Sequence, residues 1–64
     1  MNDELAGLQS AATSLAELTR TITDAADRLL AAGADGAASD LYEVERALRN
    51  ASRKLTRLLA APRD

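Results

Sequence analysis

The sequence predicts an all-α protein, an antiparallel two-helix hairpin with coiled-coil heptads that pairs with another hairpin into a four-helix bundle. The composition is the first reason, because Ala supplies 15 and Leu 11 of the 64 residues while Phe and Trp are absent. An apolar set with so few aromatic and β-branched members is typical of helices. Large apolar residues also recur every seven positions in two segments, which indicates supercoiled helices. One cluster of turn-forming residues, 33–36, separates the two segments.

The first predicted helix covers about residues 3–32. Asn2 or Asp3 can cap its first turn, because short polar side chains accept hydrogen bonds from the free N–H groups there. One apolar line repeats every seven residues along this segment, and a second line follows it three positions later. The first line is Leu8, Leu15, Ile22 and Leu29, and the second is Ala11, Leu18, Ala25 and Ala32.

The predicted turn covers residues 33–39. Gly33 suits the left-handed backbone position that follows the end of many helices. Asp40 with Glu43 three residues later is typical of a capping box, which would open the second helix, and Ser39 is the competing cap. A connection this short makes the two helices antiparallel.

The second predicted helix covers about residues 40–60, and Pro62 would end it because proline cannot sit inside a helix. It repeats the same two lines of apolar residues. Leu41, Leu48 and Leu55 form the first line, and Val44, Ala51 and Leu58 form the second.

Both lines of each helix are expected to meet between the helices, in a register where the numbers of facing residues sum to 73. Ala25 would then face Leu48, Ile22 would face Ala51, and Ala11 would face Pro62. Such layers of large against small residues are what close packing requires. The predicted intramolecular seam is Leu8, Ala11, Leu15, Leu18, Ile22, Ala25, Leu29, Leu41, Val44, Leu48, Ala51, Leu55 and Leu58.

Further apolar residues flank this seam and widen the apolar stripe from a two-stranded pattern toward that of a bundle. A lone hairpin would leave them in water, so they are the candidate interface with a partner. They are Leu5, Ala12, Ala26, Leu30, Tyr42, Ala47 and Leu59.

Catalysis has no support in the residue types. The chain has no His and no Cys, which excludes disulfides, zinc clusters and thiolate chemistry. A single hairpin offers no concave pocket of the size that small-molecule sites need. We therefore expect no enzyme activity, no catalytic residue, no cofactor and no metal.

Basic side chains gather in the second helix. Residues 36–64 carry six basic and four acidic side chains, whereas residues 1–35 carry two basic and six acidic ones. A stripe of exposed arginines can bind phosphates or an acidic protein. The competing interpretation is a set of ordinary surface pairs such as Glu45 with Arg49. The candidate anion-binding residues are Arg46, Arg49, Arg53 and Arg57.

The favoured function is a small interaction module that self-associates, preferably as a dimer, and that could also dock on a larger partner. Binding of nucleic acid or an acidic protein through the arginine stripe is the alternative, as is a helical half of a heteromeric complex such as an antitoxin or an adaptor. The acidic start and the lack of a long apolar run favour a cytoplasmic protein without membrane contact.

Overall fold

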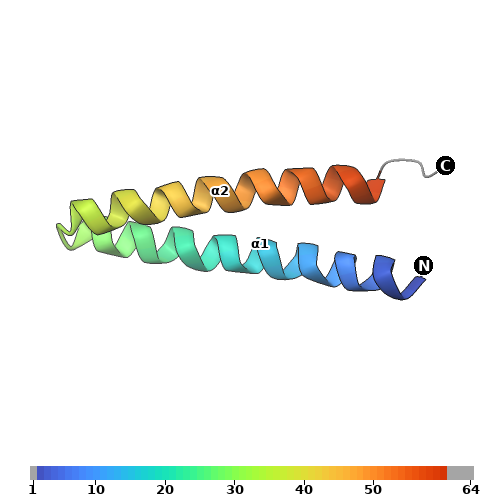
Figure 1. Ribbon diagram of the computed structural model, residues 1–64. Helices are drawn as coiled ribbons and strands as arrows, with labels where there is room; N and C mark the ends of the chain where they lie inside the picture. The colour runs from blue at the N-terminus through green and yellow to red at the C-terminus, as the bar shows by residue number, and fades with distance from the viewer. Residues whose placement is uncertain (1, 61–64) are drawn as a thin grey trace.

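The computed structural model describes residues 2–60, which form two long α-helices joined by a tight turn. Helix α1 covers Asn2–Ala31 and helix α2 covers Asp35–Ala60. The helices pack antiparallel against each other, so that the start of α1 and the end of α2 lie at the end of the hairpin opposite the turn (Figure 1). We call that end the open end. The molecule measures 50 × 16 × 11 Å, a rod two helices wide.

Helix α1 begins and ends one residue before the predicted bounds. Its first turn contains Asp3 and Glu4, and its last turn contains Arg28. This order places negative charge at the positive end of the helix dipole and positive charge at its negative end. The charged residues therefore support the ends of the helix, and the apolar residues between them determine its packing.

The turn is built around Gly33, whose φ of 85° is the left-handed conformation predicted for it. The N–H of Ala34 donates to the carbonyl oxygen of Leu29 at 2.9 Å, and the N–H of Gly33 donates to that of Leu30 at 3.0 Å. These two bonds are those of a Schellman motif, which satisfies the last carbonyls of a helix. The prediction for Gly33 is confirmed.

Helix α2 begins at Asp35, five residues before the predicted start. Residues 35–39, which were expected to belong to the turn, are helical, so Ser39, Asp40 and Glu43 lie inside the helix rather than at its cap. The N–H of Ala38 already donates to the carbonyl oxygen of Ala34 at 3.0 Å. The carboxylate of Asp35 in the first turn is favourable at the N-terminal end of the helix dipole. Pro62, predicted to end this helix, lies outside the described residues.

The earlier start of α2 changes the register between the helices. Two side-chain hydrogen bonds cross the hairpin, from Thr23 to Glu45 and from Tyr42 to Asp27. The residue numbers of these pairs sum to 68 and 69, not to the predicted 73, because the chain reverses around residue 34. The predicted level of Ile22 with Ala51, and the other pairs of that register, are corrected accordingly.

The residues between the helices form one continuous line on each helix, which we call the inner seam. All of its members are buried or half-buried, and among residues 3–60 only Ala26 and Ala38 are fully buried. No large side chain is fully buried in that part of the chain. The seam consists of Ala12, Leu15, Thr19, Ile22, Ala26 and Leu29 of α1, and Ala38, Leu41, Glu45, Leu48, Ser52, Leu55 and Leu59 of α2.

Candidate interaction surface

The inner seam contains only one of the two apolar lines that were expected to share it. Of the first line, Leu15, Ile22, Leu29, Leu41, Leu48 and Leu55 are half-buried, whereas Leu8 is exposed. Its companion is the set of residues four positions later, not three. Those residues are mostly small, among them Ala12, Ala26 and Ser52, and small residues allow two helices to approach closely. The helices therefore pack along the line with more small side chains, and the large side chains of the other line lie outside this contact.

The excluded line is exposed and contains three large apolar side chains. Leu18 is 48% exposed, Val44 is 44% exposed and Leu58 is 54% exposed. Each lies three positions after a seam residue. Because the helices are antiparallel, the residues three positions after each member of the first apolar line lie on the same side of the hairpin in both helices. We call this side the apolar face. It consists of Ala11, Leu18, Ala25, Val44, Ala51 and Leu58, of which only Ala25 is half-buried.

Large and small residues alternate along the apolar face. In the register set by Asp27 and Tyr42, whose numbers sum to 69, Leu58 lies level with Ala11. By the same sum Leu18 lies level with Ala51, and Val44 lies level with Ala25. The large side chain therefore belongs to α2, then to α1, then to α2 again on passing from the open end to the turn. At each level one large side chain therefore protrudes beside a small one.

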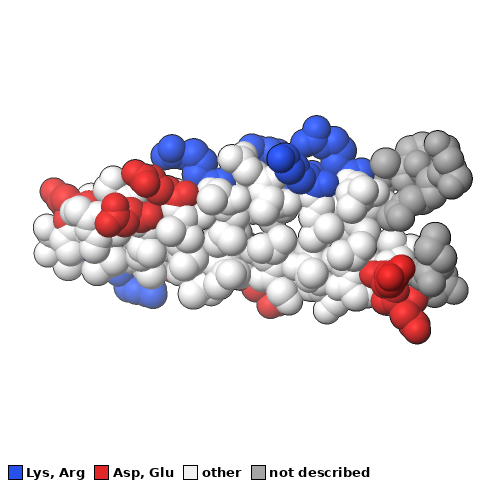
Figure 2. Space-filling view, in the orientation of Figure 1, with Lys and Arg blue, Asp and Glu red and all other residues white. Residues whose placement is uncertain are grey.

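No charged residue belongs to the apolar face, and charged groups lie at its edges. In Figure 2, uncharged atoms form a band that runs from the turn to the open end over both helices. Basic groups lie along the edge formed by α2 and also at the α1 edge near the turn, and acidic groups lie near the turn, near the start of α1 and at the α1 edge between them. The distribution is that of an interface with an apolar centre and a polar rim.

The opposite side of the hairpin, which we call the polar face, is held by hydrogen bonds. The hydroxyl of Thr23 lies 3.1 Å from Oε2 of Glu45 and 3.0 Å from the carbonyl oxygen of Thr19, and it shares its proton between them. The Nε of Arg49 donates to the same Glu45 oxygen at 2.7 Å. The Glu45 side chain is 16% exposed, so this carboxylate bridges the two helices within a partly dry environment. A shallow groove beside it is lined by Ala16, Thr19, Arg20, Thr23, Asp24 and Arg49.

A second contact on the polar face lies nearer the turn. The hydroxyl of Tyr42 donates to Oδ1 of Asp27 at 2.6 Å. This hydrogen bond to a carboxylate, together with desolvation and the nearby negative charges, raises the pKa of Tyr42 above its usual value of 10.0. Tyr42 was expected to meet a partner, but it is half-buried and ties α2 to α1.

The other residues predicted to flank the seam separate into three groups. Ala12, Ala26 and Leu59 belong to the inner seam and are not available to a partner. Leu30 is 51% exposed but follows a seam residue by one position, which places it on the polar face. Ala47 is exposed at the edge of the apolar face.

Two leucines lie at the open end. Leu5 and Leu8 are exposed although they continue the line of the inner seam. In the observed register Leu8 lies level with Ala60, the last described residue of α2.

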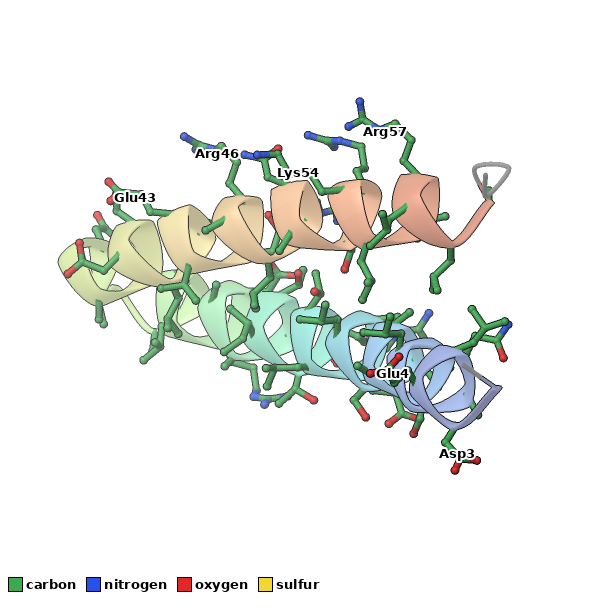
Figure 3. All side chains as sticks on the ribbon, turned by 45° about the vertical axis from the view of Figure 1, so that its right-hand side comes forward. Asp3, Glu4, Glu43, Arg46, Lys54 and Arg57 are labelled. Atoms are coloured by element: carbon green, nitrogen blue, oxygen red, sulfur yellow. The ribbon has the colours of Figure 1, made fainter. Side chains whose placement is uncertain are left out.

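The predicted arginine stripe is exposed, but two of its members already have side-chain partners. Arg49 pairs with Glu45, and Arg53 donates a hydrogen bond to Oδ1 of Asn50. Arg46 and Arg57 project from the outer side of α2, as does Lys54 (Figure 3). No acidic residue lies between positions 46 and 60. The outer side of the second half of α2 is therefore a basic ridge, separate from the apolar face.

Two features are absent from residues 2–60. That part of the chain holds no cluster of three acidic, His or Cys side chains able to bind an ion. Neither α1 nor α2 contains a stretch apolar enough, at the required length, to cross a membrane. Comparison with known protein families, with curated proteins and with solved structures gives no match.

Sequence reasoning missed the polar members of the inner seam, which are Thr19, Glu45 and Ser52. A signal for them was present in the spacing of small residues, because Ala12, Ala26 and Ala38 lie on the same line as these three. A line of leucines every seven residues can be completed three or four positions later, and only the second choice leaves Leu18, Val44 and Leu58 outside the contact between the helices.

Proposed function

We propose that this chain is a non-catalytic association module, and that two copies pack their apolar faces together to form a four-helix bundle. The observation that carries the proposal is the exposure of Leu18, Val44 and Leu58 on one side of a hairpin without a single fully buried large side chain in its described part. Full burial of a leucine or valine is worth about 1.5–3 kcal/mol. About half of that gain is still unused at each of these three positions.

The surface area of the chain supports the same function. The hairpin exposes 4845 Å². A folded monomer of 6.7 kDa is expected to expose about 3,900 Å². The excess of about 900 Å² is close to the roughly 800 Å² that each partner buries in a standard protein interface. A rod only two helices wide has this excess because it lacks a second layer.

A second copy fits the apolar face better than an unrelated surface would. Each level of the face presents one large and one small residue, so the face is complementary to itself after a twofold rotation. The resulting bundle would bury the inner seams and the apolar faces together, as three apolar positions per heptad allow. The polar faces would remain in water on the outside.

Matched leucine variants test this proposal. Leu18→Ser places a polar group in the apolar face, whereas Leu30→Ser makes the same change at an almost equally exposed leucine on the polar face of the same helix. Sedimentation equilibrium should give the wild type about twice the 6.7 kDa chain mass at micromolar concentration. Leu18→Ser should weaken association by at least about tenfold, since it removes apolar burial in both copies, and Leu30→Ser should leave it unchanged.

Two results would contradict the proposal. One is a wild-type chain that is helical and monomeric throughout the micromolar range, which would assign the apolar face to a different helical protein. The other is an equal loss of association in Leu18→Ser and Leu30→Ser, which would mean that the two faces do not differ. Circular dichroism of each variant shows whether the hairpin itself is still folded.

A further inference from the structure

The charges at the edges of the apolar face distinguish two ways of pairing the hairpins. A twofold axis parallel to the helices brings both turns to the same end of the bundle and sets α1 beside α2 of the other copy. A twofold axis across the helices brings the turns to opposite ends and sets α1 beside α1 and α2 beside α2. Both arrangements are four-helix bundles with antiparallel neighbours. They differ in which charges and which side chains meet.

Net charge favours the first arrangement. Helix α1 carries five acidic and two basic side chains, a net charge of −3. Helix α2 carries four acidic and five basic side chains, a net charge of +1, and all five basic ones lie between positions 46 and 57. Packing α2 against α2 would bring these basic segments alongside each other near the middle of the bundle. Packing α1 against α2 instead places opposite charges on neighbouring helices.

One specific pair agrees with this choice. Arg28 follows Ala25 by three positions and Asp40 precedes Val44 by four, which places each at the outer edge of the apolar face, and both are exposed. Their numbers sum to 68, the register of Thr23 with Glu45, so they lie at the same level of the hairpin. Within one chain no ion pair joins them. With the turns at the same end, Arg28 of each copy lies beside Asp40 of the other.

The apolar residues favour the same arrangement. With the turns at one end, each copy keeps its levels, so Leu18 packs beside Ala51 of the other copy and Val44 packs beside Ala25. Every large side chain then has a small neighbour across the interface, which is the layering that close packing requires. With the turns at opposite ends and the bundle centred on Leu18, that leucine meets its own copy and Ala51 also meets its own copy. This alternative leaves adjacent layers overfilled and underfilled.

We therefore infer that the two hairpins pair with their turns at the same end, joined at each side by an Arg28–Asp40 ion pair between copies. This inference rests on the proposed self-association through the apolar face. It names the geometry of the partner, a second copy rotated about an axis parallel to the helices, and it identifies two charged residues that select this geometry.

Spin labels at the turn measure the orientation directly. The chain has no Cys, and a Cβ at Gly36 meets no atom within 4 Å, so Gly36→Cys gives one label per copy without disturbing the hairpin. Helix axes in bundles lie 8–10 Å apart, so turns at the same end should give a distance within roughly 25 Å between labels. Turns at opposite ends would separate the labels by about the 50 Å length of the hairpin. Gly7→Cys, which also has open space, labels the other end as a control.

A charge exchange tests the named pair. Arg28→Asp should weaken association about tenfold at low salt, because it places two like-charged pairs at the interface. Asp40→Arg should have a similar effect, and the double variant should restore wild-type association. The losses should shrink as the salt concentration rises.

The outcomes separate the two proposals. A short distance at both label positions with restoration in the double variant supports the inference. A distance near the full hairpin length in a chain that still dimerises overturns the orientation and leaves self-association intact. Additive losses in the double variant overturn the role of Arg28 and Asp40. If no distance between labels can be measured and the mass is that of a monomer, the proposed function is overturned and this inference with it.

Discussion

At the scale of single residues, Tyr42 gives a pH-dependent signal for the closed hairpin. Its hydroxyl donates to Asp27, and this bond raises the pKa of Tyr42 above 10.0. A raised folded-state pKa means that the contact stabilises the fold below pH 10 and that this contribution is lost as the pH rises through the raised value. The residue is the only aromatic one in the chain, so tyrosinate absorbance reports on it alone.

We predict that Tyr42 titrates above pH 10 in the folded protein and that Asp27→Asn moves the titration back toward 10. The substitution keeps an acceptor oxygen but removes the negative charge, so the phenolate is no longer opposed by it. Absorbance measured against pH checks this, with Asp24→Asn as the control at a neighbouring carboxylate. A wild-type titration at or below pH 10 would contradict the hydrogen bond.

Ser52 is the second residue with a measurable consequence. Its hydroxyl oxygen is buried in the inner seam and has no hydrogen-bond partner among residues 2–60. A buried polar group without a partner costs about 1–3 kcal/mol. We predict that Ser52→Ala stabilises the protein by more than Ser14→Ala, which is exposed and gains only the higher helix propensity of alanine, about 0.5 kcal/mol. Urea unfolding of both variants at one protein concentration measures the difference, and equal gains would show that Ser52 is solvated.

At the scale of elements, the sequence predicts both helices and the position of the turn, because heptads and Gly33 are local signals. It does not predict the start of α2, because Gly36 and Asp35 resemble turn residues but also fit a first helical turn. The five-residue error then shifts the register between the helices. The sequence also does not determine whether the residues three or four positions after each leucine lie between the helices, since that depends on how closely the helices approach. Leu18, Val44 and Leu58 were thus assigned to the seam, whereas they are exposed.

The two glycines of the turn region should respond oppositely to alanine. Gly33 has a φ of 85°, where a Cβ costs about 1 kcal/mol or more. Gly36 lies within α2, does not have a positive φ, and has open space around a Cβ. We predict that Gly33→Ala destabilises the protein by about 1 kcal/mol and that Gly36→Ala stabilises it by about 0.5–1 kcal/mol. Thermal unfolding followed by circular dichroism compares the two variants. A loss of stability in Gly36→Ala would indicate that Gly36 belongs to the turn and not to α2.

At the scale of the whole molecule, the hairpin resembles half of a larger core. Among its described residues only Ala26 and Ala38 are fully buried, and Leu18, Val44 and Leu58 are exposed on the apolar face, so each helix has packed only one of its two apolar sides. A chain of this size has few other means of gaining stability, because it contains no Cys for disulfides. Folding and association should therefore be linked, and the stability of the hairpin should depend on the concentration of its own chain.

The concentration dependence of the melting temperature is the broadest consequence of this linkage. Two 64-residue chains that unfold together should absorb about 90 kcal/mol. Tenfold dilution costs about 1.4 kcal/mol of association free energy. The Tm should therefore fall by about 5 °C for each tenfold dilution of the wild type, and it should change much less in Leu18→Ser over the range where that variant is monomeric. Circular dichroism in cells of different path length gives both slopes. A wild-type Tm independent of concentration would mean that one hairpin is stable with Leu18, Val44 and Leu58 in water, and that its apolar face contributes nothing to folding.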